Sequence, residues 1–264
     1  MNLQLDDVCM GAANAPRLRV PNLRLEPGRV HAVLGPNGAG KSTLMGLLAG
    51  AISPDQGQVS FLGQPWSAWS LAAAARCRAW LPQQHQMPFD LLVEQVVALG
   101  RHAHVNRPHP QESQLVAQCL HRANADALSG RSYLQLSGGE QARVQWARVL
   151  AQLIAHPQDA GVSWLLLDEP TAALDLRHQR AMMQVARDHA DAGGGVVVVL
   201  HDLALAARWA DEAVVLQSGH VRAQGPLRTT LTATLIEEVW GVSAFWAPGP
   251  FEGQDASRTH LWVA

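Results

Sequence analysis

The most informative pattern of the chain is Val-His-Ala-Val-Leu-Gly-Pro-Asn-Gly-Ala-Gly-Lys-Ser-Thr, residues 30–43. The apolar run at 30–34 is typical of a buried strand, and the apolar positions at 44–49 have the spacing of a buried helix. Between them, residues 35–42 match GxxxxGK[ST], in which the N–H groups of a glycine loop and the positive end of a helix dipole bind phosphate. A plain glycine turn is the alternative. The pattern predicts a phosphate-binding loop.

Lys41 is the only lysine of the chain, and the pattern explains why arginine does not stand in its place. A compact ammonium group can reach the β- and γ-phosphates of a nucleotide, whereas a planar guanidinium is too bulky there. The hydroxyl of Ser42 is placed to bind Mg²⁺. The residues of this loop predicted to bind the nucleotide are Gly35, Pro36, Asn37, Gly38, Ala39, Gly40, Lys41, Ser42 and Thr43.

Two carboxylates follow the apolar run Trp-Leu-Leu-Leu at residues 164–167. The carboxyl end of such a strand is where an open α/β sheet presents groups to a ligand. Asp168 can hold Mg²⁺ through water, and Glu169 is placed to polarise an attacking water. The alternative is a solvated strand end, which is common when this pattern stands alone.

A second glycine pattern is Leu-Ser-Gly-Gly-Glu at residues 136–140, where a long amphipathic helix begins. Ser137 and Glu140 suit the first turn of a helix, and a simple N-cap is the alternative. One cap residue suffices for that purpose, however, and the pair Gly138 and Gly139 leaves backbone N–H groups open to a phosphate. The pattern predicts a second phosphate-binding segment.

Apolar runs typical of strands recur along the chain, and segments with helical periodicity separate most of them. From about residue 87 to 155 such runs are absent, and helical periodicity appears instead. The predicted strands are 3–8, 18–25, 30–34, 59–62, 80–83, 164–168, 196–200 and 212–217, and the predicted helices of the middle segment are 93–101, 111–122 and 140–154.

These elements predict an α/β fold: a P-loop NTPase core with a mostly parallel sheet, an N-terminal antiparallel β segment and an inserted helical subdomain. We expect one domain over residues 1–264. Its core would comprise about 1–86 and 156–241, its helical subdomain about 87–155, and a C-terminal appendage about 242–264.

Composition excludes several classes of protein. With 264 residues, 48% of them hydrophobic, the chain can bury a sizeable core, and its net charge of −2 argues against a nucleic-acid partner. The three cysteines, Cys9, Cys77 and Cys119, form neither a disulfide framework nor a zinc pattern, which favours a reducing cytosol. No apolar run approaches the about 20 residues of a membrane span, and the acidic residues near the start are unlike a signal peptide.

Taken in order, the patterns resemble the ATP-binding-cassette ATPases. The phosphate-binding loop is followed by Gln83 after a strand, by Leu-Ser-Gly-Gly-Glu, by Leu-Leu-Leu-Asp-Glu-Pro, by Ala-Leu-Asp at 173–175 and by His201 after an apolar run. The resemblance implies ATP as ligand, with Gln83 on Mg²⁺ and on the attacking water; Gln84 is the alternative for this role. It also implies that Asp175 crosses a dimer seam and that His201 contacts the γ-phosphate.

The same resemblance implies an assembly. In this family two chains enclose two nucleotides, so Ser137, Gly138, Gly139 and Glu140 would complete the site of the partner chain. We therefore expect a homodimer, bound to two membrane-spanning permease subunits at the cytoplasmic face of the cell membrane. A substrate-binding protein would act with them indirectly, and no nucleic acid is expected.

Three further segments, 145–153, 174–179 and 200–208, resemble the haemin-importer ATPases of the iron-chelate and cobalamin import group. This similarity implies the uptake of haemin or a related iron compound, driven by ATP. A siderophore or cobalamin importer is the alternative, and a soluble cassette acting on nucleic acid is a more distant one. The cargo path belongs to other chains, so these residues report lineage and not a haem pocket.

The chain departs from the family at two positions. The family stacks an aromatic side chain on adenine upstream of the phosphate-binding loop, and the matching position, near Met10, has none. Met10 is expected to contact the base through its polarizable sulfur, with less selectivity. Ala172 stands where relatives commonly carry serine, which removes a hydroxyl near the expected dimer seam.

Overall fold

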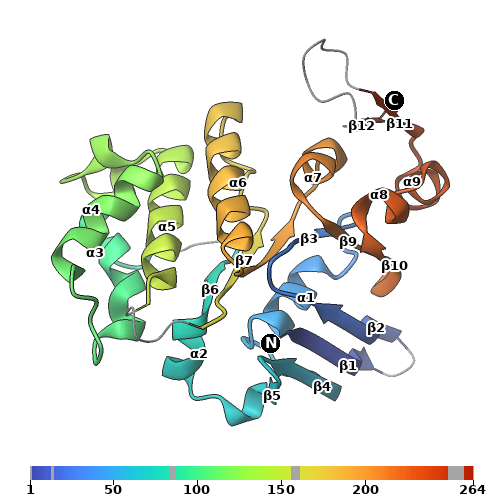
Figure 1. The fold of residues 1–264 in the computed structure, drawn as a ribbon, viewed down its shortest axis with the longest axis horizontal. Coiled ribbons are helices and arrows are strands. Elements are labelled where there is room, and N and C mark those ends of the chain that lie inside the picture. The colour runs from blue at the N-terminus through green and yellow to red at the C-terminus, as the bar shows by residue number, and fades with distance from the viewer. Residues whose placement is uncertain (1, 13–14, 84–86, 156–160, 249–258, 264) are drawn as a thin grey trace.

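The computed structural model describes residues 2–12, 15–83, 87–155, 161–248 and 259–263. These residues are organised around a ten-stranded sheet with the order β5-β4-β1-β2-β10-β9-β3-β8-β7-β6 (Figure 1). Its strands are β1 Leu3–Ala12, β2 Ala15–Leu25, β3 Val30–Leu34, β4 Gln56–Phe61, β5 Gln64–Pro65, β6 Arg78–Leu81, β7 Trp164–Asp168, β8 Gly195–Val199, β9 Glu212–Gln217 and β10 His220–Pro226.

Strands β6, β7, β8, β3 and β9 pair in parallel and form the part of the sheet that carries the phosphate-binding loop. Every residue of β3, β7 and β8 is buried. Such continuous apolar runs are typical of parallel strands that are covered on both faces. Because parallel strands share one direction, the loops after their carboxyl ends meet at the same edge of the sheet.

The N-terminal strands confirm the predicted antiparallel segment. β1 pairs with β2 from Leu3↔Leu25 to Ala12↔Ala15, and β4 pairs with the other side of β1. The expected strand at 3–8 extends to residue 12. β10 was not predicted, because its residues alternate between exposed and half-buried and form no apolar run.

The helices are α1 Lys41–Leu48, α2 Leu71–Cys77, α3 Val93–Leu99, α4 Glu112–Arg122, α5 Gly138–Leu153, α6 Leu176–Asp191, α7 Leu203–Trp209, α8 Leu227–Thr230 and α9 Ala233–Trp240. Helices α3, α4 and α5 pack together at one end of the molecule (Figure 1). The expected helix at 93–101 ends at residue 99 and continues as a short 3₁₀ segment, Gly100–His104. None of the helices in the described ranges has both the length and the apolar character needed to cross a bilayer.

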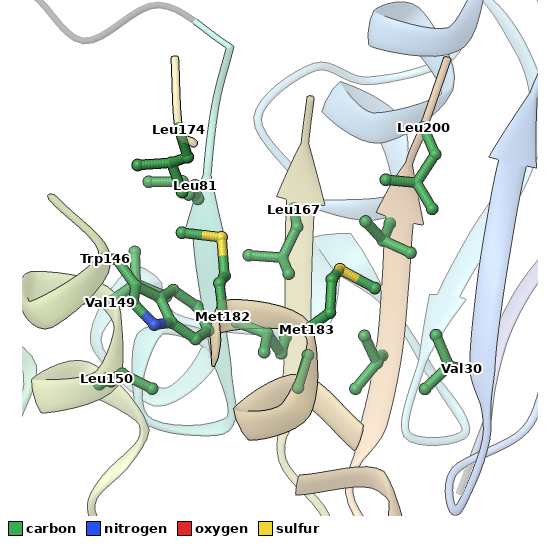
Figure 2. Close-up of a cluster of buried hydrophobic side chains, with 14 of the residues drawn as sticks. Val30, Leu81, Trp146, Val149, Leu150, Leu167, Leu174, Met182, Met183 and Leu200 are labelled. Carbon is green, nitrogen blue, oxygen red and sulfur yellow. The ribbon is translucent and has the colours of Figure 1, made fainter. Parts of the chain in front are cut away.

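Two apolar cores hold the parallel strands on opposite faces. In β7, Leu165 and Leu167 belong to the first core, and Trp164 and Leu166 belong to the second. Figure 2 shows the first core, where Met182 and Met183 from α6 lie among side chains of the strands and of α5. Because its side chains alternate between the two cores, β7 is packed on both faces up to its carboxyl end, where the predicted catalytic residues follow.

The C-terminal segment forms a separate two-stranded sheet of β11, Ala244–Pro248, and β12, Thr259–Val263. The indole N–H of Trp246 donates to the carbonyl of Leu231 at 2.9 Å, and β12 packs on α7. The sequence of this segment, rich in Pro, Gly and aromatic residues, did not predict the hairpin.

Candidate active site

The loop between β3 and α1 has a backbone that only glycine can adopt at two positions. Gly35 has φ +149°, and a Cβ there would lie 2.2 Å from the backbone oxygen of Leu216. Gly40, with φ +102°, is the N-cap residue of α1, and no side chain caps this helix. The first N–H groups of α1 therefore have no side-chain acceptor and face the loop, which is the arrangement that binds phosphate.

Lys41 lies across the loop with only 6% of its surface exposed. Its Nζ donates to the carbonyl oxygens of Gly35 at 2.9 Å and of Pro36 at 3.0 Å. Burial lowers the pKa of Lys41, and the nearby charges of Glu169 and Asp168 oppose that shift. A phosphate group would replace the two carbonyls as a stronger, charged acceptor.

Asp168, the last residue of β7, is 3% exposed, and its Oδ1 atom has no hydrogen-bond partner in the described structure. Burial raises the pKa of Asp168, and Glu169 raises it further, whereas the Ser42 hydroxyl, Lys41 and His201 lower it. An orphaned, buried carboxylate oxygen beside a serine hydroxyl fits a small hard cation that prefers oxygen ligands. No group of three or more His, Cys, Asp or Glu with metal-binding geometry occurs in the described ranges, so phosphate and water oxygens would have to complete the coordination of Mg²⁺.

Glu169 is contacted by two side chains from neighbouring loops. Its Oε1 lies 2.6 Å from Nε2 of His201, and its Oε2 accepts a hydrogen bond of 2.7 Å from Nε2 of Gln83. Gln83 follows β6, Glu169 follows β7 and His201 follows β8, which are three adjacent strands of the sheet. Glu169 also adopts a positive φ of 52°, which is rare for a residue with a side chain and is a feature of functional sites.

A pocket of about 700 Å³ joins the phosphate-binding loop to these three groups. The residues that line it are Arg17, Asn37, Gly38, Gly40, Lys41, Ser42, Thr43, Gln83, Glu169 and His201. Gly35 and Pro36 do not line it, but their carbonyl oxygens accept hydrogen bonds from Lys41, which does; Ala39 is buried in the second core. Gln84, the alternative to Gln83, lies outside the described residues.

Two residues bear on the expected base-binding end of the site, Met10 and Arg17. Met10 does not line the pocket; it is partly buried and packs against the second core. Arg17, which no motif pointed to, does line it. The signal in the sequence was the alternation of charged and apolar residues at 17–20, which is typical of a strand with one buried face. In the structure Leu18 is buried and Arg17 is exposed.

Ser137, Gly138, Gly139 and Glu140 do not line this pocket. They form the first turn of α5, where the Ser137 side chain accepts from the N–H of Glu140, and Glu140 accepts from the backbone N–H of Ser137 at 2.8 Å. These hydrogen bonds, with one from Arg131, lower the pKa of Glu140 to about 2. The N-terminus of α5 is therefore an ordered, capped turn on the surface.

Asp175 lies next to this turn and also outside the pocket. A Cβ on Gly139 would be 3.0 Å from the carbonyl oxygen of Ala173, so the two segments are in close contact. Asp175 caps α6 by accepting from the N–H and the Nδ1 of His178, and these hydrogen bonds lower the pKa of its carboxyl group. The two segments expected at a dimer seam thus form one surface of this chain.

Comparison with known proteins agrees with this geometry. Residues 18–172, more than half of the chain, match the family model described as "ABC transporter". The chain belongs to the ABC transporter family. As an ABC transporter ATPase, it binds ATP and hydrolyses it to drive transport.

Curated relatives of this ABC transporter ATPase cover nearly its whole length. It is 46% identical over 231 residues to the hemin import ATP-binding protein HmuV of Pseudomonas entomophila, covering 88% of this chain and 89% of the relative. It is 42% identical over 254 residues to the protein of the same name from Bordetella avium, covering 96% and 97%.

Solved ABC transporter structures share the fold. An inward-facing transporter ascribed to the metal-chelate type superposes with a TM-score of 0.78 at 26% identity, covering 100% of this chain and 97% of that one. A dimeric ATP-binding cassette bound to ADP and Pi in a post-hydrolysis state superposes with a TM-score of 0.72 at 25% identity, covering 86% and 99%.

Proposed function

We propose that this chain is the ATP-hydrolysing subunit of an importer for haemin or a related iron compound. The observation that carries the proposal is the identity of 42–46% to two hemin import ATP-binding proteins, over about nine-tenths of each chain or more. The chain acts at the cytoplasmic face of the cell membrane, bound to two membrane-spanning permease subunits. A substrate-binding protein delivers the cargo to those permeases.

In the proposed site, the loop and Lys41 bind the β- and γ-phosphates, with the N–H groups of α1 as further donors. Ser42, Asp168 and Gln83 are the residues that would hold Mg²⁺. When bound, the ion neutralises charge on the phosphates and on the transferring phosphoryl group. The orphaned Oδ1 of Asp168 supports this assignment.

Glu169 orients the attacking water and accepts its proton, because its carboxylate lines the pocket and is positioned there by Gln83 and His201. His201 aligns the γ-phosphate with that water. Catalysis in this arrangement rests on positioning and on charge neutralisation, with no covalent intermediate on the protein.

Each chain supplies half of two composite sites. Ser137, Gly138 and Gly139, with Glu140 fixing their turn, contact the γ-phosphate held by the partner chain, and Asp175 crosses the seam beside them. Two observations support this: these residues lie outside the pocket of their own chain, and they adjoin one another on its surface. ATP binding then closes the homodimer, and hydrolysis reopens it.

The helical segment at about 87–155 is the part that transmits this motion to the permease. We assign it as a subdomain inserted into the core of about 1–86 and 156–241, with residues 242–264 as an appendage on that core. Gln83 joins the core to the subdomain and also contacts Glu169, so it can couple the state of the site to the orientation of α3, α4 and α5.

Growth on defined nutrients tests the cargo. A strain lacking this gene is compared on haemin, on a ferric siderophore and on iron salts, and is complemented with the native gene or with Glu169→Gln. Loss of growth on haemin alone, restored by the native gene and not by the variant, supports the proposal. Normal growth on haemin with loss of siderophore use, or a loss of cobalamin uptake, would overturn it.

A further inference from the structure

The strand order places Arg17 at the opposite end of the pocket from the catalytic groups. Along the sheet, β2 with Arg17 comes first, then β10, β9 and β3, which leads into the phosphate-binding loop, and then β8, β7 and β6. Glu169 and Gln83 follow the last two strands. A nucleotide whose triphosphate lies over the loop, with its γ-phosphate toward Glu169, therefore extends its base toward β2.

Arg17 lies beside the phosphate-binding loop, where the base of such a nucleotide would lie. Its carbonyl oxygen would lie 3.4 Å from a Cβ on Gly40, the N-cap residue of α1, so the β2 backbone runs directly beside the loop. Its side chain is exposed and lines the pocket. Within the described ranges the Arg17 guanidinium has no hydrogen bond or ion pair, whereas Arg24 of the same strand lies 3.6 Å from Glu26.

The other described residues of the pocket offer no group suited to a purine ring. None of the lining residues that the structure describes is Phe, Tyr or Trp, and the imidazole of His201 is engaged with Glu169. A guanidinium is planar, delocalised and weakly hydrated, and it stacks on aromatic faces. Among the described residues of the lining, an uncommitted arginine at this end of the pocket is thus the side chain that can cover the face of a base.

We propose that Arg17 binds the nucleotide base by stacking its guanidinium on the purine ring, in the position where an aromatic side chain is absent. The inference rests on the nucleotide orientation given under the proposed function. Because adenine and guanine both present a π face, this contact binds them with similar strength. Arg17 is then a determinant of affinity and of weak base selectivity, and it has no part in hydrolysis.

Calorimetric titration with Mg·ADP, Mg·GDP and Mg·pyrophosphate tests the proposal, because pyrophosphate keeps the phosphate contacts and lacks the base. Arg17→Ala is expected to weaken both nucleotides by about threefold to thirtyfold and to leave pyrophosphate unchanged. Arg17→Tyr, which restores a stacking surface, is expected to bind them at least as tightly as wild type. Arg17→Lys, which keeps the charge without the plane, is expected to resemble Arg17→Ala.

Arg19→Ala is the matched control, since Arg19 is exposed on the same strand and lines a different hollow beside Asp7 and Cys9. It is expected to bind all three ligands like wild type. Equal loss of pyrophosphate and ADP in Arg17→Ala would overturn the inference, and so would wild-type affinity in Arg17→Lys. Weakening by Met10→Ala and not by Arg17→Ala would place the base on Met10 instead. If the native protein bound ADP no more tightly than the Lys41→Ala variant does, the nucleotide site itself would be wrong.

Discussion

Nε2 of His201 lies 2.6 Å from Oε1 of Glu169, and the second oxygen of the same carboxylate accepts from Gln83. The three side chains come from loops that are far apart in the sequence and follow adjacent parallel strands. Both oxygens of Glu169 are therefore oriented before any ligand binds. A carboxylate held in this way is preorganised: it can align a water and accept its proton without first changing its conformation.

Glu169→Gln should abolish most hydrolysis and keep nucleotide binding. The amide can still hydrogen-bond to Gln83 or His201, but it cannot accept a proton, so turnover should fall about 100-fold or more. Phosphate release measures turnover, and calorimetry measures binding. Glu238→Gln, a matched change at an exposed carboxylate paired with Arg222, should leave turnover unchanged. Turnover near wild type in Glu169→Gln would show that another group activates the water.

Mixing two inactive variants tests the shared sites. Ser137→Arg should disable the partner's site, and Lys41→Ala should disable its own. In a heterodimer of the two, one composite site carries both changes and the other is intact, so ATPase activity should reappear in part. Ser70→Arg removes an N-cap from α2 in the same way, away from the pocket, and should keep full activity as the control for folding. Confirmed heterodimers without any activity would contradict sharing across the seam.

Asp168→Asn should stabilise the free protein while removing its response to Mg²⁺. Burial raises the pKa of Asp168 above its ordinary value of 3.8, so the folded chain holds this proton to a higher pH than the unfolded chain does. The free energy of unfolding therefore falls as the pH rises from the pKa of Asp168 in the unfolded chain to its higher pKa in the folded chain, and it stays lowered above that range. Asparagine carries no charge, so the variant does not lose this stability.

Thermal unfolding without nucleotide, measured from pH 4 to 8, checks this prediction. The melting temperature of Asp168→Asn should exceed that of wild type by an amount that grows with pH. Titration with ATP should show that Mg²⁺ increases the affinity for ATP in wild type and does not increase it in the variant. A variant that melts below wild type across this range would mean that the charged form of Asp168 stabilises the empty site.

Arg101→Met should destabilise the fold by about 2–4 kcal/mol. Arg101 is 7% exposed, pairs with Glu112 at 2.8 Å and donates to the carbonyl oxygens of Ala151 and Ile154 at the end of α5. Methionine keeps much of the volume and leaves those acceptors without a donor. Arg222→Met, at an exposed pair with Glu238, should cost under about 0.5 kcal/mol in urea unfolding. If Arg101→Met and Arg222→Met lowered the free energy of unfolding equally, the buried hydrogen bonds and ion pair of Arg101 would contribute nothing to stability.

The local features of this chain could be predicted from residue order alone. Residues 30–43 specify a strand, a loop and a helix because Gly35 and Gly40 adopt conformations closed to other residues, and because apolar periodicity marks the flanks. The runs that became β7 and β8 are continuous and apolar, as fully covered parallel strands require. The antiparallel start and the three helices of the middle segment follow from the same periodicities, with ends shifted by a few residues.

The tertiary structure decided which of these segments share a site. Gln83, Glu169 and His201 meet because β6, β7 and β8 are adjacent and parallel, and no local pattern states the order of strands in a sheet. Arg17 reached the pocket, and Met10 the edge of a core, because the register of the β1–β2 hairpin places Met10 opposite Leu18 and turns Arg17 outward. Register and strand order depend on contacts between distant residues, whereas glycine conformation and apolar spacing are properties of neighbouring ones.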